Sequence, residues 1–145
     1  MATTNVINGT LAVLKTGTDH ATATAFAFST SASISLSMDT RDISNKSSAG
    51  WRELLEAQMS WSASLEGLYA IEDAGSSAVK NYDELYDLLT SRTNTFLELS
   101  TGVTGDFYYY GKVYLTSLEQ SAPLEDNMTF SATFEGTAAL TKGTI

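Results

Sequence analysis

The most constraining feature of the sequence is a run of strict alternation from residue 25 to residue 39, AFAFSTSASISLSMD. One set of alternate positions is apolar and runs from Phe26 to Met38, whereas the other set is almost entirely serine. Successive side chains of a strand point to opposite faces, so the run predicts one long strand with an apolar face and a hydroxyl face. Such a strand would reach roughly 45 Å, which is longer than most strands of a single domain. It therefore needs neighbours, from the same chain or from other copies, and its serine face suits contact with water.

The bulk composition limits the class of protein. A chain of 145 residues is expected to form a single domain, residues 1–145, with room for a core. A hydrophobic fraction of 43% excludes a disordered chain. The net charge of −9, from 17 acidic and 8 basic residues, disfavours gripping nucleic acid by counterion release. No apolar run approaches the ~20 residues of a membrane span, and no signal peptide is recognisable, so we expect assembly from the cytoplasm.

The segments beside the serine-rich strand predict a hairpin and a long loop. Residues 10–15 fit a short strand, and the turn at residues 17–19 would pair it with the serine-rich strand. Residues 39–50, DTRDISNKSSAG, form a long polar connection that fits either a contact arm for another subunit or a flexible surface loop. Residues 51–58 fit a helical turn or an irregular strand. Residues 59–69 then alternate again, with serines on one face.

The second half of the chain predicts one helix and three more strands. A linker at residues 72–80 leads to Asn81, which can cap a helix whose apolar stripe comprises Tyr82, Leu85, Tyr86, Leu88 and Leu89. Strands are expected at residues 95–101, 107–121 and 128–136, with a bulge between Leu115 and Leu118. Residues 137–145 extend the last strand or form a tail. The fold class is mainly β (α+β): about seven strands in a β-sandwich or partial barrel, with one flanking α-helix and a long polar loop.

The residues needed for common catalytic and metal sites are missing. There is no cysteine, and His20 is the single histidine, so zinc sites and a Ser-His-acid elbow are not expected. No glycine-rich phosphate loop is present. Adjacent acid pairs are best interpreted as solvated turns. Tyr108 and Tyr110 share a strand face without basic neighbours, which favours packing over base stacking. The sequence predicts a protein that is not an enzyme and needs no cofactor or metal.

Four segments follow one another along the chain: an opening strand at Gly9 and Thr10; SISLSMDTRDISNKSSAGWRE, residues 33–53; SWSASLEGL, residues 60–68, with the helix around YDELYDLL, residues 82–89; and YLTSLEQSAPLEDNMTFSATFEGTAALT, residues 114–141. Together they resemble the major tail protein family of long-tailed bacteriophages, which builds the tail tube. The Asp-Thr-Arg-Asp loop with Gly-Trp and the Ser-Ala-Pro turn are the more specific parts of this resemblance.

The resemblance implies a virion protein that forms hexameric rings, and these rings stack into a tube through which double-stranded DNA passes. It also implies the tape measure protein and the tail tip and terminator proteins as partners. Two alternatives remain: a monomeric β-sandwich that binds carbohydrate or acts as an adhesin, and the tube protein of a contractile tail or secretion system.

Two sets of site residues follow from the alternation and the resemblance. The hydroxyl faces would line the bore, with Ser33, Ser35, Ser37, Ser62, Ser64 and Glu66 as candidates. The polar loop would contact the adjacent ring, with Asp39, Arg41, Asp42 and Lys46 as candidates.

Overall fold

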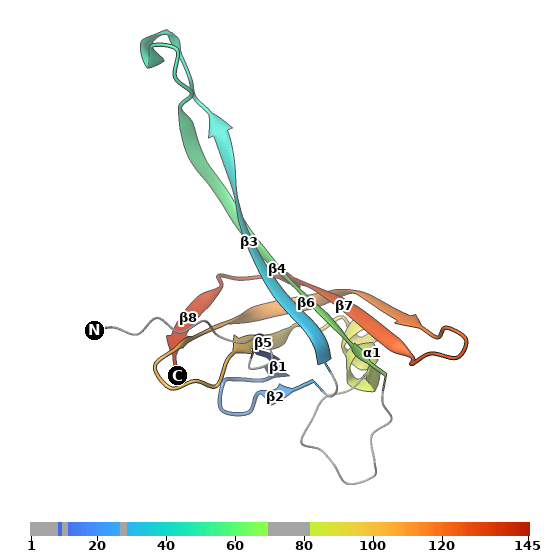
Figure 1. Ribbon diagram of the computed structural model, residues 1–145. Coiled ribbons are helices and arrows are strands. Elements are labelled where there is room, and N and C mark those ends of the chain that lie inside the picture. The colour runs from blue at the N-terminus through green and yellow to red at the C-terminus, as the bar shows by residue number, and fades with distance from the viewer. Residues whose placement is uncertain (1–8, 10–11, 27–28, 70–81) are drawn as a thin grey trace.

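The computed structural model describes residues 9, 12–26, 29–69 and 82–145, and these are mostly strand (Figure 1). The strands are β1 (Val13–Gly17), β2 (Thr24–Ala25), β3 (Ser29–Asp42), β4 (Leu54–Leu68), β5 (Thr95–Ser100), β6 (Phe107–Ser121), β7 (Thr129–Gly136) and β8 (Thr141–Thr144). The helix α1 spans Tyr82–Ser91, and a short 3-10 turn spans Lys46–Ser48. The predicted mainly β class with one flanking helix is confirmed.

All eight strands belong to one antiparallel sheet that does not close. Its order is β2-β1-β5-β6-β7-β4-β3, and β8 also pairs with β6. The long strand β6 joins the two halves of the sheet, because its first part pairs with β5 and its remainder pairs with β7. β8 continues along the edge of β6 that β7 occupies. The strands of a sandwich are therefore present, but as two halves of one bent sheet.

The core lies where the apolar sides of the two halves meet. Leu14 and Leu97 come from one half, Leu65 and Phe134 from the other, and all four side chains are fully buried in one cluster. Helix α1 adds Leu85, which is also fully buried. Each such side chain stabilises the fold by roughly 1.5–3 kcal/mol through burial. Tyr86, expected in the same stripe, is exposed instead, because it is rotated by about 100° from Leu85 around the helix.

The predicted hairpin between the first strand and the strand at residues 25–39 forms only at the start of that run, where Lys15 pairs with Ala25. β1 pairs with β5 over its whole length, and the turn after it returns only to the two-residue strand β2. β3 lies at the other end of the sheet. The turn residues correctly indicated a reversal, but the partner is chosen by burial: Leu14 is opposite Leu99 on β5, some 85 positions away in the chain.

Several predicted boundaries also change. The serine-rich strand continues to Asp42, so the connection after it begins at Ile43 rather than at residue 39. Residues 54–58 are strand, as the irregular-strand alternative expected. The bulge predicted in β6 is confirmed as a register shift between Leu115 and Ser117. The C-terminal residues form the separate strand β8. The predicted linker at 72–80 and the cap Asn81 lie outside the described residues.

Candidate functional site

The β3–β4 hairpin extends far beyond the rest of the sheet as an arm, residues 36–61, that ends in a tip, residues 43–53 (Figure 1). Near the body, the apolar side of the hairpin packs on the core through Ala32 and Leu65. Further out, Leu36, Met38 and Met59 continue the same alternation, yet each is at least half exposed. The arm thus carries its apolar face beyond the core that could bury it. Such a face is typical of an interaction surface.

Trp61 holds the root of the arm against the body. Its side chain is buried, and its Nε1 donates a hydrogen bond of 2.7 Å to the carbonyl of Ala138. The indole ring lies directly over Gly111 and Gly136, where a Cβ atom would come within 2.5 and 2.2 Å of the ring. Only glycine leaves room for this approach. The arm therefore leaves the body at a place where its direction is set by close packing.

The tip is a hydrogen-bonded structure, not an irregular loop. Asn45 caps the 3-10 turn by accepting from the backbone N–H of Ser47 at 2.7 Å, and the Ser44 hydroxyl accepts from the N–H of Glu53 at 2.8 Å. Asp42 accepts from the N–H of Ser44 at 2.9 Å. These bonds from Ser44, with a smaller contribution from Arg52, hold the pKa of Asp42 below its ordinary value. The reversal is completed by Ala49 and Gly50, both in the left-handed region.

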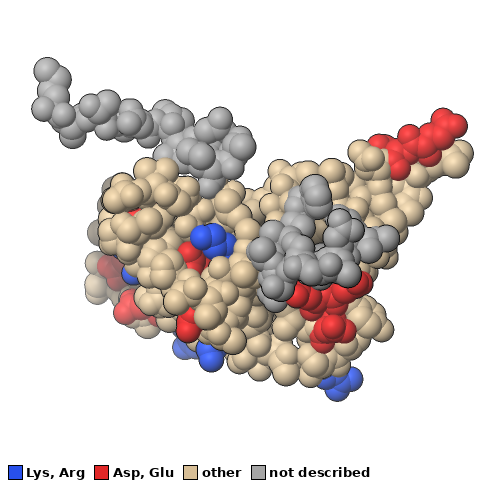
Figure 2. All heavy atoms as spheres, turned by 90° about the horizontal axis from the view of Figure 1, so that it is seen from below, with Lys and Arg blue, Asp and Glu red and all other residues tan. Residues whose placement is uncertain are grey.

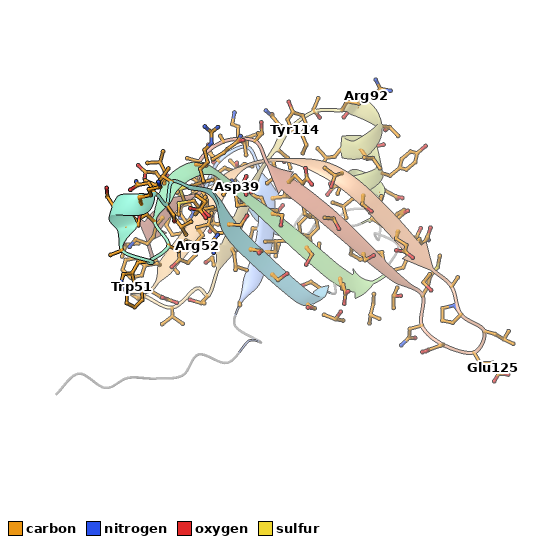
Figure 3. The ribbon with its side chains drawn as sticks, turned by 90° about the horizontal axis from the view of Figure 1, so that it is seen from above. Asp39, Trp51, Arg52, Arg92, Tyr114 and Glu125 are labelled. Carbon is orange, nitrogen blue, oxygen red and sulfur yellow. The ribbon has the colours of Figure 1, made fainter. Side chains whose placement is uncertain are left out.

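The tip presents Trp51 to solvent. Its side chain is 80% exposed at the end of the arm, next to Arg52 (Figure 3). Of the candidate contact residues, Asp39, Arg41 and Asp42 lie in the last part of β3 and not in a loop, whereas Lys46 lies in the 3-10 turn. All four are exposed and lie at or near the tip. Trp51 was not among the candidates for the contact between rings, although the sequence places it directly after the polar loop.

The candidate bore-lining residues lie together on one face of the sheet. Ser33, Ser35 and Ser37 on β3 are directly opposite Ser64, Ser62 and Ser60 on β4. The hydroxyl oxygens of Ser33 and Ser64 are 2.6 Å apart, and those of Ser37 and Ser60 are 2.9 Å apart. Cross-strand hydrogen bonds therefore satisfy part of this hydroxyl face, and the remainder is open to water.

The same polar face continues over β7 and β6, which the candidate set did not include. Ser64 on β4 is opposite Thr133 on β7, which in turn is opposite Ser117 on β6. In the same way, Glu66 is opposite Ser131, and Ser131 is opposite Glu119. Glu135 stands opposite Ser62. We call this surface the polar face: Ser33, Ser35, Ser37, Ser60, Ser62, Ser64, Glu66, Ser117, Glu119, Ser131, Thr133 and Glu135. The alternation in residues 129–135 was a signal for the extension, but only the pairing shows that these strands are neighbours.

The single histidine lies over the other half of the sheet. His20 Nδ1 is 2.6 Å from Glu98 Oε2, and its ring stacks on Tyr108 with centroids 4.2 Å apart. The Glu98 side chain is fully buried, which a carboxylate tolerates when it has a partner. This pair ties the turn after β1 to β5. It lies away from the arm and the polar face.

Within the residues that the structure describes, no three histidine or acidic side chains come together as a metal site would require. The described helix is too short and too polar to traverse a bilayer.

Comparisons with known proteins identify the family. A family model described as phage tail tube protein matches residues 7–142. No curated protein matches the chain in sequence. Among solved structures, the tail of an empty gene transfer agent particle, refined with C6 symmetry, has a TM-score of 0.75 at 20% identity and covers 94% of this chain and 98% of that chain. The tail tube of SPP1 has a TM-score of 0.74 at 15% identity, covering 97% and 80% of the two chains.

The fold is also similar to that of a chain from a contractile injection system. A chain of the sheath–tube complex of an extracellular contractile injection system has a TM-score of 0.64 at 16% identity, covering 92% of this chain and 88% of that one. At these identities the structural likeness establishes a shared fold. The family match covers nearly the whole chain and favours a structural tube component over a carbohydrate-binding module. The chain belongs to the phage tail tube protein family.

Proposed function

We propose that six copies of this chain form a ring, and that rings stack into a tail tube through which double-stranded DNA passes. The observation that carries the proposal is the combination of a projecting arm with an unpartnered apolar side and a separate polar sheet face. The apolar side of the arm suits contact with another protein, whereas the polar face suits contact with water. The C6 symmetry of the gene transfer agent tail supports six copies per ring.

The polar face is the proposed wall of the bore. It presents hydroxyl groups together with Glu66, Glu119 and Glu135, and no lysine or arginine is among the residues that define it, although Arg41 lies further along β3 and Lys112 further along β6. Duplex DNA binds proteins mainly through cations that neutralise its phosphates. A wall of water-binding hydroxyls and like charges offers no such contact, so DNA would pass without specific binding. The tape measure protein would occupy the same bore before the DNA.

Unpaired strand edges support closure into a ring. Among the described residues, the outer edge of β3 has no strand partner, and residues 114–121 of β6 pair only with β7. Exposed edges of this length promote uncontrolled pairing unless they are covered. Pairing of the β3 edge of one copy with this part of β6 in the next copy would continue the polar face around a closed barrel. A closed barrel has no free edges.

The remaining partners follow from the place of a tube in a virion. Tube growth would begin on a tail tip complex, end at a terminator protein, and take place in the cytoplasm of the host bacterium before the tail joins the virion.

The test is negative-stain electron microscopy of the purified protein, first concentrated alone and then seeded with tail tips. We expect hollow tubes with a uniform bore and six-fold rings. A sample that remains monomeric even with tips, or that forms rings of another symmetry, would overturn the corresponding part of the proposal.

A further inference from the structure

The polar tip of the arm and the strand ends beside it carry exposed apolar side chains that the isolated chain does not explain. Trp51 is the most exposed large apolar residue of the tip, and Ile43, Leu54 and Leu55 at its base are each more than 40% exposed. The hydrogen bonds of the tip hold the loop in one shape, so Trp51 is presented from a defined platform. Exposed tryptophans on rigid platforms are frequent anchors of protein interfaces.

A groove with an apolar floor, which suits an apolar side chain such as that of Trp51, lies between α1 and the β1 end of the sheet. Its volume is about 410 Å³, which admits an indole ring. Phe26, Leu85 and Leu88 form its apolar floor, and Thr18, Asp87 and Ser91 lie at its rim. No role in the polar face or the arm accounts for this groove.

The tip carries charges of both signs, whereas the helix beside the groove is acidic. Three of the eight basic residues, Arg41, Lys46 and Arg52, lie at or beside the tip, together with the acidic residues Asp42 and Glu53. Arg52 is 3.7 Å from Asp42, whereas Lys46 has no acidic partner among the residues that the structure describes. The helix beside the groove is acidic in its first turns, with Asp83, Glu84 and Asp87. From below, acidic side chains gather on the α1 side of the body (Figure 2).

The two surfaces face opposite ways on the molecule. The arm projects from the upper part of the body in Figure 1, and α1, β1 and β2 lie at its lower part. A tip therefore cannot reach the groove of its own chain, but it can reach that of a second copy. A protruding patch that fits a pocket elsewhere on the same molecule gives a head-to-tail contact, which repeats without closing. Such a contact propagates a stack.

We propose that the tip of one copy docks in the α1–β1 groove of a copy in the adjacent ring, with Trp51 as the anchor and Lys46 facing Asp87. This inference rests on the proposed tube and specifies the surface that receives the arm. It makes each chain both donor and acceptor of the same contact.

Disulfide trapping tests the contact cleanly, because the chain has no native cysteine. The double variant Ser47→Cys/Ser91→Cys places one thiol on the tip and one on the rim of the groove, with both original side chains exposed or at the surface. Oxidation of assembled tubes is expected to give a ladder of dimers, trimers and longer chains on a denaturing gel. The control Ser47→Cys/Leu124→Cys carries its second thiol at a leucine that is 93% exposed, in the β6–β7 loop, and should give no ladder.

A second pair of variants measures the anchor. Trp51→Ala and Leu124→Ala each remove a large exposed side chain, 80% and 93% exposed, so both monomers should fold normally. Only Trp51→Ala is expected to raise the protein concentration needed for tube growth, by about tenfold or more if it is an interface anchor. Circular dichroism of both monomers checks the fold.

The outcomes separate this inference from the proposed function. Tubes that form without a Ser47–Ser91 ladder, or with a ladder in the Leu124 control instead, would overturn the docking site and leave the tube function standing. Equal assembly of Trp51→Ala and Leu124→Ala would also overturn it. Failure of the unsubstituted protein to form any tube, even when seeded, would instead overturn the proposed function.

Discussion

At the scale of single residues, the contact of Trp61 with two glycines has the largest structural consequence. The ring lies on Gly111 and Gly136 from neighbouring strands and bonds to Ala138 beyond β7. Three segments are thus joined at the root of the arm. Trp51, only ten positions earlier, has the opposite environment and is almost fully exposed. One tryptophan anchors the arm to its own chain, and the other is available for a neighbour.

We predict that Gly136→Ala destabilises the protein by about 1–3 kcal/mol, because the new methyl group would overlap a buried ring that has no space to move. Urea unfolding measures the change. Gly9→Ala is the matched control, since nothing lies within 4 Å of its Cβ position, and it should shift stability by less than about 0.5 kcal/mol. Combining Gly136→Ala with Trp61→Phe should cost less than the sum of the two single changes. If the losses of stability from Gly136→Ala and Trp61→Phe were additive, overlap with the Trp61 ring would not be the cause of the Gly136→Ala destabilisation.

At the scale of elements, the tip is held by a carboxylate and so depends on pH. The hydroxyl and N–H of Ser44, and then Arg52, hold the pKa of Asp42 below its ordinary value of 3.8. A lowered pKa in the folded state means that the ionised form stabilises the tip above pH 3.8, and that this stabilisation is lost as the pH falls through the lower folded pKa. The exposed site makes the effect local to residues 42–53 and not a change in global stability.

We therefore predict that the Asp42 carboxyl, followed by carbon NMR, titrates below pH 3.8, and that the amide signal of Ser44 shifts with it as their hydrogen bond breaks. Asp42→Asn keeps the side-chain shape but removes the titration, so the Ser44 amide should then be insensitive to pH in this range. An Asp42 carboxyl that titrates at or above 3.8 would contradict the hydrogen bonding assigned to the tip.

At the scale of the whole molecule, one face of the bent sheet stabilises the fold and the other is available for function. The apolar side forms the core with α1, and the polar face remains uncovered in the single chain. If the polar face lines a bore, assembly should hide it from large reagents while leaving it wet. This consequence does not depend on which residues form the contacts between rings.

We predict that Ser64→Cys reacts readily with a bulky polymer-linked maleimide in the monomer and is strongly protected in assembled tubes. Leu124→Cys, in the exposed β6–β7 loop, should react in both states. A gel shift after brief labelling reports both reactions. Equal labelling of Ser64→Cys in monomers and tubes would place the polar face on the outer wall.

The sequence alone determined the local features, because period-two alternation directly reports which side of a strand meets the core. It predicted the serine faces of β3 and β4, the strands β5, β6 and β7, the bulge after Leu115, and the helix that buries Leu85. It also led, through the resemblance, to the family that the comparisons establish. The bore and contact assignments remain predictions.

The tertiary structure decided what is joined to what. Pairing of β1 with β5, the extension of the polar face from β4 to β7, and the seating of Trp61 on Gly136 all connect residues more than 50 positions apart. The same alternation of apolar and polar residues occurs in every strand, so it does not indicate which strands pair with each other. The partner is selected by the total burial of many distant side chains, which exists only once the chain has folded.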